Sequence, residues 1–216
     1  MVSLPTDLSE ALWSPTQSVV FRKTTEAWGG LSNMAPGFTI SVGSTTFLTS
    51  EALYQAMRFP GRPDVQEMII EQGSPMTAKM KSKKFRREDS HPQWDSIRVA
   101  VMHWCLELKL AQNWTIFGEL LRSTEPLQIV EHSSRDCFWG AVPHGDFLKG
   151  SNVLGRLLMS LRDSANLSGA PPDTVHPPGV ALRLLGQSVP TWLAAPSSPS
   201  VAKVAPPGQQ GHLDFE

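Results

Sequence analysis

The chain has 216 residues, 40% of them hydrophobic and 18% charged, which is enough for one domain with a sizeable core. Its formal net charge is −1, so the protein is not a polycation, and any contact with nucleic acid needs a local basic patch. Two cysteines are too few for a disulfide framework, the histidines form no metal motif, and no apolar run could span a bilayer; we therefore expect a cytoplasmic protein without a metal or other cofactor.

The chain begins with a segment, residues 1–17, that mixes Ser, Pro and Thr with a few apolar residues and is predicted to be an N-terminal arm. A β-prone run at residues 18–21 and a small hairpin at residues 38–48 are expected on either side of a glycine-rich loop. That loop contains Asn33, whose amide can donate and accept hydrogen bonds. Its position is equally consistent with a ligand contact and with an ordinary turn residue.

Three short helices are predicted next. The first covers residues 49–59, between a hydroxyl N-cap and a proline, and carries Glu51 in its first turn. Glu51 suits the helix dipole there, or it acts as a catalytic or ribose-binding acid. The second helix is expected to begin at a capping box formed by Asp64 and Glu67, and the third, which carries Lys79, follows a Ser-Pro cap.

A basic run begins at Lys79, and six of the nine residues at positions 79–87 are Lys or Arg. Such a run is usually a solvated face, and cations also suit the end of a helix. The functional alternative is contact with a phosphate backbone, and in a chain of net charge −1 this is the one segment that could make it. The candidate DNA-binding residues are Lys81, Lys83, Lys84, Arg86 and Arg87.

The longest helix is predicted over residues 94–113, where apolar residues recur at helical spacing, and it is expected to form the core. Thr115 is expected to cap another helix that leads into a strand at residues 127–130. Nine of the 18 prolines fall within residues 164–216, so this part is predicted to be a flexible, Pro-rich tail rather than a second domain.

The turn before the last predicted helix has the features of a ligand site. Asp136 and Trp139 lie three residues apart in a segment that ends at Gly140, so a carboxylate and a large ring can project together toward a sugar or a base. The alternative is structural: Asp136 would cap the turn, and Trp139 would pack at the edge of the core.

A second feature of this region is the sequence Gly-Ser-Asn at residues 150–152. Asn152 is expected to be the N-cap of an amphipathic helix whose apolar residues begin at Val153. The free backbone N–H groups of such a helix start favour a phosphate. Alternatively, Asn152 only caps its helix.

Six motifs in order resemble the NADAR (YbiA-like) family over residues 18–163. They are Trp-Gly-Gly-Leu-Ser-Asn-Met-Ala-Pro at 28–36, Thr-Ser-Glu-Ala-Leu-Tyr-Gln-Ala at 49–56, Ser-Pro-Met-Thr-Ala-Lys at 74–79, Leu-Lys-Leu-Ala-Gln-Asn at 108–113, Glu-x4-Asp-x2-Trp-Gly at 131–140 and Gly-x-Asn-x2-Gly-x3-Met-x2-Arg at 150–162. The resemblance implies a single compact, mainly helical α+β domain with a small antiparallel β element, and an enzyme that hydrolyses N-glycosidic bonds.

One branch of this family acts on a phosphoribosylamino-pyrimidine intermediate of riboflavin synthesis, and another resembles the antitoxin of DarT-type toxin–antitoxin pairs, which removes ADP-ribose from guanine in DNA. Ser-Asn-Met-Ala-Pro at 32–36 and Phe-Trp-Gly-Ala-Val-Pro at 138–143 look like the antitoxin branch. The resemblance therefore implies a glycohydrolase for ADP-ribosylated DNA, with a cognate toxin as a candidate partner. The alternatives are the riboflavin-pathway N-glycosidase and a non-catalytic ADP-ribose binding module.

The resemblance also implies roles for individual residues. Lys79 is the expected nucleophile, forming a Schiff base with the opened sugar, while Glu51 moves protons and Asp136 orients ribose hydroxyls or assists as an acid. For Arg162 a structural pairing is the favoured alternative to a phosphate contact. The expected substrate-binding residues are Trp28, Asn33, Trp139, Gly140, Gly150, Asn152 and Arg162.

Overall fold

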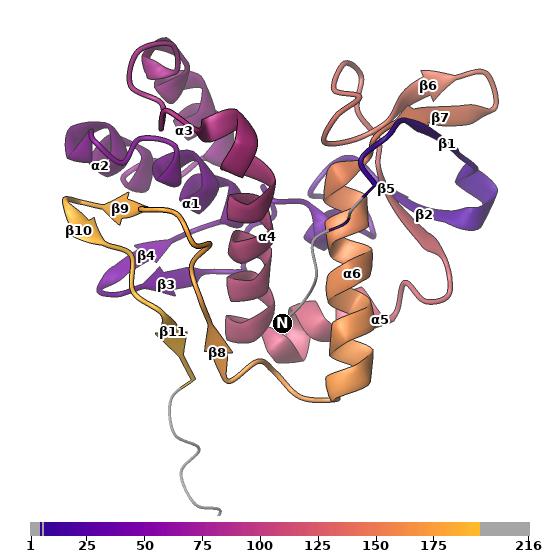
Figure 1. The fold of residues 1–216 in the computed structure, drawn as a ribbon. Coiled ribbons are helices and arrows are strands. Elements are labelled where there is room, and N and C mark those ends of the chain that lie inside the picture. The colour runs from indigo at the N-terminus through magenta and orange to yellow at the C-terminus, as the bar shows by residue number, and fades with distance from the viewer. Residues whose placement is uncertain (1–4, 6, 195–216) are drawn as a thin grey trace, which may run out of the picture.

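The structure is a computed structural model that describes residue 5 and residues 7–194. Helices α4 and α6 run side by side through the centre, with α1–α3 and two small hairpins on one side and strands β1, β2 and β5–β7 on the other (Figure 1). The fold is α+β and mainly helical, as the sequence predicts. The helices are α1 Ser50–Met57, α2 Pro63–Ile70, α3 Pro75–Ser82, α4 Trp94–Gln112, α5 Glu119–Arg122 and α6 Val153–Ser168.

The strands form small sheets rather than one large one. A parallel pair joins β2 to β5, and an antiparallel sheet has the order β1-β7-β6. Antiparallel pairs join β3 to β4, β9 to β10 and β8 to β11. The strands are β1 Ala11–Trp13, β2 Ser18–Phe21, β3 Ile40–Val42, β4 Thr45–Phe47, β5 Gln128–Glu131, β6 Val142–His144, β7 Phe147–Gly150, β8 Thr174–Val175, β9 Arg183–Leu184, β10 Gln187–Ser188 and β11 Trp192–Leu193.

The central helices are packed by burial of apolar side chains on both sides of α4. Helix α4 contacts α1, β3, α6 and β8, and its residues Val101, Cys105 and Leu108 are fully buried. Helix α6 approaches β5 closely at Gly155, where an added Cβ would collide with the carbonyl of Ile129. A glycine at this position therefore lets the last helix pack directly against the strand that leads into the candidate site.

The helix caps expected at Thr49 and Ser74 are formed, and those expected at Asp64 and Thr115 are not. The side chain of Thr49 accepts from the N–H of residue 52 and caps α1, and Ser74 caps α3 in the same way. Helix α2, however, begins at Pro63, and Asp64 pairs with Arg62 instead of capping. Thr115 lies within a π-helical turn, Trp114–Gly118, that leads into α5. In both cases the helix starts one residue earlier than the polar side chain that was expected to cap it.

Both ends of the described chain are part of the domain, which differs from the predicted arm and tail. Within residues 1–17, β1 pairs with β7, and the buried Trp13 donates from Nε1 to the carbonyl of Gly150 over 2.9 Å. Within residues 164–194, α6 continues to Ser168, and Val175 and Leu184 are buried against the core. Apolar residues spaced between the prolines anchor this segment. Residues 1–4, 6 and 195–216 of the predicted arm and tail lie outside the described residues.

No helix among the described residues is both long and apolar enough to cross a membrane. Within the same part of the chain, no group of three or more His, Cys, Asp and Glu side chains is arranged to hold a metal ion.

Candidate active site

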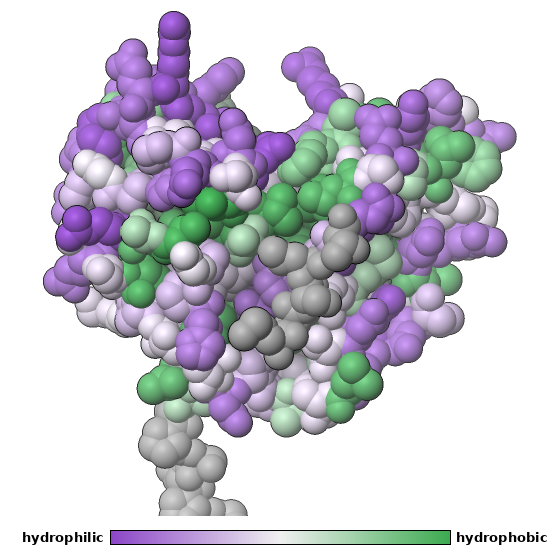
Figure 2. Space-filling view, in the orientation of Figure 1, coloured by the Kyte–Doolittle hydropathy of each residue, from purple (hydrophilic) through white to green (hydrophobic). Residues whose placement is uncertain are grey.

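A polar cavity of about 400 Å³ lies between α1, α3 and α4 on one side and the connection from β5 to α6 on the other. The upper edge of the molecule is hollowed between these same two halves (Figure 2). The cavity walls carry charged side chains of both signs together with aromatic rings. They include Glu51, Asp95, Glu131, Asp136, Arg22, Arg58, Lys79, Arg86, Arg98, Tyr54, Trp94, Phe138 and Trp139.

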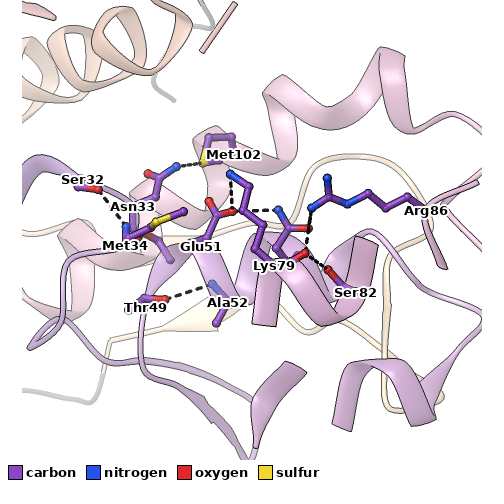
Figure 3. Close-up of polar contacts among 12 residues, drawn as sticks. Ser32, Asn33, Met34, Thr49, Glu51, Ala52, Lys79, Ser82, Arg86 and Met102 are labelled. Atoms are coloured by element: carbon purple, nitrogen blue, oxygen red, sulfur yellow. Dashed lines mark hydrogen bonds and ion pairs between the residues drawn. The ribbon is translucent and has the colours of Figure 1, made fainter. Parts of the chain in front are cut away.

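Lys79 and Glu51 meet in this cavity as an amine and a carboxylate. The Nζ atom of Lys79 on α3 lies 3.4 Å from Oε1 of Glu51 on α1 (Figure 3). The Glu51 side chain is 5% exposed and the Lys79 side chain 42%, so the acid lies at the bottom of the site and the amine can be reached from solvent. Gln55 donates to the same Glu51 oxygen over 2.9 Å, which fixes the orientation of the carboxylate.

Asn33 lies beside this pair and is almost fully buried. Its backbone carbonyl accepts from the N–H of Glu51 and from the hydroxyl of Ser50, so the loop is tied to the first turn of α1. Its side-chain Nδ2 donates to Sδ of Met102, whereas Oδ1 has no partner among the described residues (Figure 3). A buried amide oxygen without a partner is costly, so this oxygen is available to a ligand donor such as a ribose hydroxyl.

A buried lysine supports the Asn33 loop from behind. Nζ of Lys109 donates to the carbonyls of Gly30 and Ser32 at 2.7 and 3.1 Å, and it faces the rings of Phe38 and Phe117. No carboxylate pairs with it among the described residues, and burial lowers the pKa of Lys109 to about 7. The loop that presents Asn33 is therefore held by carbonyl and cation–π contacts.

Asp136 and Trp139 both line the cavity. Both also make the structural contacts that were expected as the alternative to ligand binding. Oδ1 of Asp136 accepts from the N–H groups of Phe138 and Trp139, each at 2.9 Å, so it caps the turn. The Trp139 ring meets the rings of Tyr54 and Phe138 edge to face. The Asp136 carboxylate is exposed, and its Oδ2 makes no hydrogen bond among the described residues.

Glu131 is a cavity residue to which the sequence reasoning gave no role. It ends β5, and burial raises its pKa to about 7; the nearby carboxylates of Glu51 and Asp136 add to this rise, and Lys79 opposes it. A carboxyl group with such a pKa is often protonated at neutral pH and can donate a proton. The signal that could have identified it is a single acid at the end of the apolar run Ile129–Val130.

The phosphate site predicted at the start of α6 is not formed. Asn152 is fully buried with φ of 47° and makes no side-chain cap. Its Oδ1 accepts from the N–H of Glu131 and its Nδ2 donates to the carbonyl of Ile129, at 3.0 and 2.8 Å. The N–H groups of residues 151–154 donate to the carbonyls of residues 137–140. The donors that would bind a phosphate are therefore used within the chain, and Asn152 joins α6 to β5.

Four other predicted substrate-binding residues lie outside the cavity walls. Trp28 lines a separate pocket beside β2, and Arg162 is buried, where it donates to Oγ1 of Thr124 and to the carbonyl of Leu127. Gly140 and Gly150 are positions of close backbone packing. A Cβ added at Gly140 would lie 2.6 Å from the carbonyl oxygen of residue 131, and a Cβ added at Gly150 would lie 2.5 Å from the carbonyl oxygen of residue 140. The contacts of Arg162, Gly140 and Gly150 give these three residues a role in the fold, and the partly buried Trp28 packs against the core.

In the structure, the residues of the basic run after Lys79 fall into two groups. Arg86 turns into the cavity, where its guanidinium donates to Oε1 of Gln55 and to the carbonyl of Lys79 at 3.3 and 3.4 Å (Figure 3). The other members of the run after Lys79 are exposed: Lys81, Lys83, Lys84 and Arg87. Arg86 therefore belongs to the cavity, and the remaining four are the candidates for contact with nucleic acid.

Known proteins share this fold and much of this sequence. N-glycosidase YbiA of Escherichia coli K12 is 36% identical over 146 residues, which are 66% of this chain and 85% of that protein. The NMR structure of E. coli YbiA matches with a TM-score of 0.60 and 31% identity, over 72% of this chain and 92% of the other. A riboflavin biosynthesis protein of Vibrio vulnificus is 33% identical over 147 residues, which are 68% of this chain and 38% of that protein.

The profile of the NADAR domain matches residues 20–166, which include every residue of the cavity wall named above. Two relatives that differ in name, an N-glycosidase and a riboflavin biosynthesis protein, each align with about two thirds of the chain. The chain belongs to the NADAR domain family.

Proposed function

We propose that this protein is an N-glycosidase that hydrolyses the bond between a ribose and a base. The observation that carries the proposal is the contact between the Lys79 amine and the buried Glu51 carboxylate inside a polar cavity. The names of the E. coli and Shigella relatives, which are N-glycosidases, support the same activity. The rings of Tyr54 and Trp139 and the free Oδ1 of Asn33 suit a base and a ribose in the same cavity.

In the proposed reaction, Glu51 takes a proton from the Lys79 ammonium, and the neutral amine adds to the anomeric carbon of the ribose. The base leaves with the electron pair of the broken C–N bond and takes a proton from the carboxyl group of Glu131. The Lys79 nitrogen then loses a proton to the Glu131 carboxylate, and the ring oxygen departs with the proton that Glu51 carries, which leaves a protonated Schiff base between Lys79 and the opened sugar. Water adds to this imine and releases the sugar aldehyde and the free amine. Asp136 orients the ribose hydroxyls.

The role of Glu131 predicts a pH profile. Above a pH of about 7 this carboxyl loses the proton that it would donate, so kcat/KM is expected to fall on the basic side with a midpoint near 7. Glu131→Gln is expected to lower kcat/KM by about 10²-fold and to remove that limb. For Asp136→Asn, the quantity compared is the pH midpoint of the basic limb and not the rate. This midpoint should move to lower pH, because the variant lacks a negative charge that raises the pKa of Glu131. A Glu131→Gln enzyme that keeps the same limb would show that another group donates the proton.

We propose further that the substrate is ADP-ribose attached to guanine in DNA, so that the protein reverses the modification made by a DarT-type toxin. The exposed cations of the basic run support this, because a soluble nucleotide would not need them. Co-expression with such a toxin is the test: an active protein should restore growth, and no rescue by a folded, expressed protein would reject this substrate. We expect the protein to act in the cytoplasm, because the DNA that the toxin modifies and the ADP-ribosylated DNA that results would both lie there.

The basic run predicts a difference between large and small substrates. The double charge reversal Lys83→Glu and Lys84→Glu is expected to lower kcat/KM on a modified oligonucleotide by about 10-fold or more at low salt and to weaken its salt dependence. Activity on ADP-ribosyl-guanosine should be nearly unchanged. Lys149→Glu with Arg183→Glu is the matched control, because it makes the same charge change at exposed positions on β7 and β9. Equal losses of kcat/KM in both double variants would show that the basic run is a solvated face without a specific contact to DNA.

The second candidate is an N-glycosidase for a phosphoribosylamino-pyrimidine. The relatives named as riboflavin biosynthesis proteins in V. vulnificus and maize favour it. Cleavage of that compound with no cleavage of the modified oligonucleotide would select it. A non-catalytic ADP-ribose binding module is the third, and tight binding of ADP-ribose with no turnover of any ribosyl-base substrate would select that.

A further inference from the structure

Three arginines from separate segments line the cavity close to one another. Arg58 follows the last residue of α1, Arg86 follows α3, and Arg98 lies in the second turn of α4. They are close enough that Arg86 and Arg98 both lower the pKa of Arg58, after the larger effect of its burial. Like charges repel, so the fold holds together three cations that would separate in the absence of other contacts.

Stacking and hydrogen bonds fix these guanidinium groups. Arg98 stacks on the ring of Phe138, with its Cζ 3.9 Å from the ring centroid, and Arg58 lies 5.3 Å from the centroid of Trp94. Nε of Arg58 donates to the hydroxyl of Ser90 over 2.7 Å. A guanidinium that is stacked on a ring is oriented as a flat fork, which is the geometry that binds two oxygens of a phosphate.

No carboxylate forms an ion pair with any of the three within the described part of the chain. The ion pairs there involve other residues, and Asp95, the acid that raises the pKa of Arg58, makes no such contact with it. Nε of Arg86 and Nε of Arg98 are buried and have no hydrogen-bond partner among the described residues. Buried arginine donors are usually matched by anions, so the missing partner is expected to come from a ligand.

The position of the cluster relative to Glu51 gives the site a direction. Glu51 and Arg58 lie on the cavity face of α1 seven residues apart, which is about 10 Å along a helix axis. Tyr54 lies between them on the helix: burial raises the pKa of Tyr54 most, Glu51 raises it further, and Arg98 and Arg58 lower it. Arg58 and Arg98 therefore lie on the other side of Tyr54 from Glu51, while Arg86, which donates to Gln55 and to the carbonyl of Lys79, lies closer to the Lys79–Glu51 pair. A ribose with a 5′-phosphate has the same arrangement, with its anomeric carbon and its phosphate at opposite ends.

We propose that Arg58, Arg86 and Arg98 form a phosphate subsite that binds the 5′-phosphate or 5′-diphosphate of a ribosyl substrate and places its anomeric carbon at Lys79. This proposal rests on the N-glycosidase function proposed above. The start of α6 is no longer the expected position of the phosphate, because its N–H groups already donate to carbonyls within the chain. The arginine subsite takes its place.

Binding of the product-like probes ADP-ribose, ribose 5-phosphate and unphosphorylated ribose by calorimetry tests the subsite without any turnover. We expect the full chain to bind both phosphorylated probes at least 10-fold more tightly than ribose, with inorganic pyrophosphate as a competitor. Arg58→Ala and Arg98→Ala should each raise the Kd of the phosphorylated probes by about 10-fold or more, since each removes a charge-assisted contact. Stronger competition by inorganic pyrophosphate than by inorganic phosphate would identify a diphosphate site, and equal competition a monophosphate site.

Controls separate loss of binding from loss of folding. Arg183→Ala, at an exposed position on β9, should bind the probes as the parent does. Arg98→Lys keeps the charge without the flat fork, and it should fold normally and bind with intermediate affinity. Folded Arg58 and Arg98 variants that bind ADP-ribose as tightly as the parent, or a parent that does not distinguish ribose 5-phosphate from ribose, would overturn the proposal. A parent that binds through these arginines and cleaves no substrate would support the subsite and reject the glycosidase function.

Discussion

Replacing Lys79 with alanine is expected to lower kcat/KM by about 10⁴-fold or more, because Lys79 is the one lysine among the described residues that line the cavity and the proposed covalent step needs its amine. Glu51→Gln should cost about 10²- to 10⁴-fold, since the amide cannot take the proton from the Lys79 ammonium 3.4 Å away. Both rates are measured on the substrate that the parent enzyme cleaves. Lys149→Ala is the control for the rate, because Lys149 is exposed on β7, outside the cavity wall and the basic run. Lys81→Ala, on the same helix as Lys79, is the control for covalent trapping.

Borohydride trapping shows whether the loss reflects a Schiff base. Reduction during turnover should attach the sugar to the peptide that contains Lys79 in the parent and in Lys81→Ala, and to no peptide in Lys79→Ala. An equal adduct in Lys79→Ala, or no adduct in the active parent, would contradict the covalent mechanism. In that case the Lys79–Glu51 contact would act on the substrate by electrostatics alone.

Asn152→Ala is expected to destabilise the fold by about 2–4 kcal/mol, because the N–H of Glu131 and the carbonyl of Ile129 lose their buried partners. Alanine also tolerates the left-handed backbone at this position less well than asparagine. Urea denaturation measures the change. Asn166→Ala, an exposed position on the same helix, is the control and should change stability by less than about 0.5 kcal/mol.

Asn152→Asp distinguishes the bridge from a helix cap. Aspartate caps helices as well as asparagine does, so a capping residue would tolerate this change. A bridge needs an acceptor toward Glu131 and a donor toward Ile129, and a carboxylate supplies only the first. We therefore expect Asn152→Asp to be at least as destabilising as Asn152→Ala at neutral pH. A stable Asn152→Asp protein would mean that the side chain acts mainly at the helix start.

Features that depend on local sequence could be predicted. The hydroxyl caps Thr49 and Ser74 and the helical spacing of apolar residues in α4 involve residues a few positions apart. The same holds for the location of Glu51 and Lys79 in the first and last turns of α1 and α3, although their contact across two helices came from the family resemblance.

Features that depend on distant partners could not be predicted. The partners of Asn152 lie 21 and 23 residues earlier, and the indole of Trp13 bonds a carbonyl 137 residues away. The arginine cluster has the same origin, because Arg58 and Arg98 are unremarkable in their own segments and become a group only when α1 and α4 pack together. Composition misled at the C-terminal segment, where a few buried apolar residues outweigh many prolines in residues 164–194.

Release of ADP-ribose from an oligonucleotide that carries ADP-ribosylated guanine tests the central claim most directly. Parent protein, Lys79→Ala and Glu51→Gln are assayed in parallel, and thermal unfolding confirms that each is folded. We predict release of free ADP-ribose and restored guanine by the parent, release at least about 10²-fold slower by Glu51→Gln, and no measurable release by Lys79→Ala. A folded parent that releases nothing, or variants that release ADP-ribose at the parent rate, would contradict the assignment of this cavity as the glycosidase site for modified DNA.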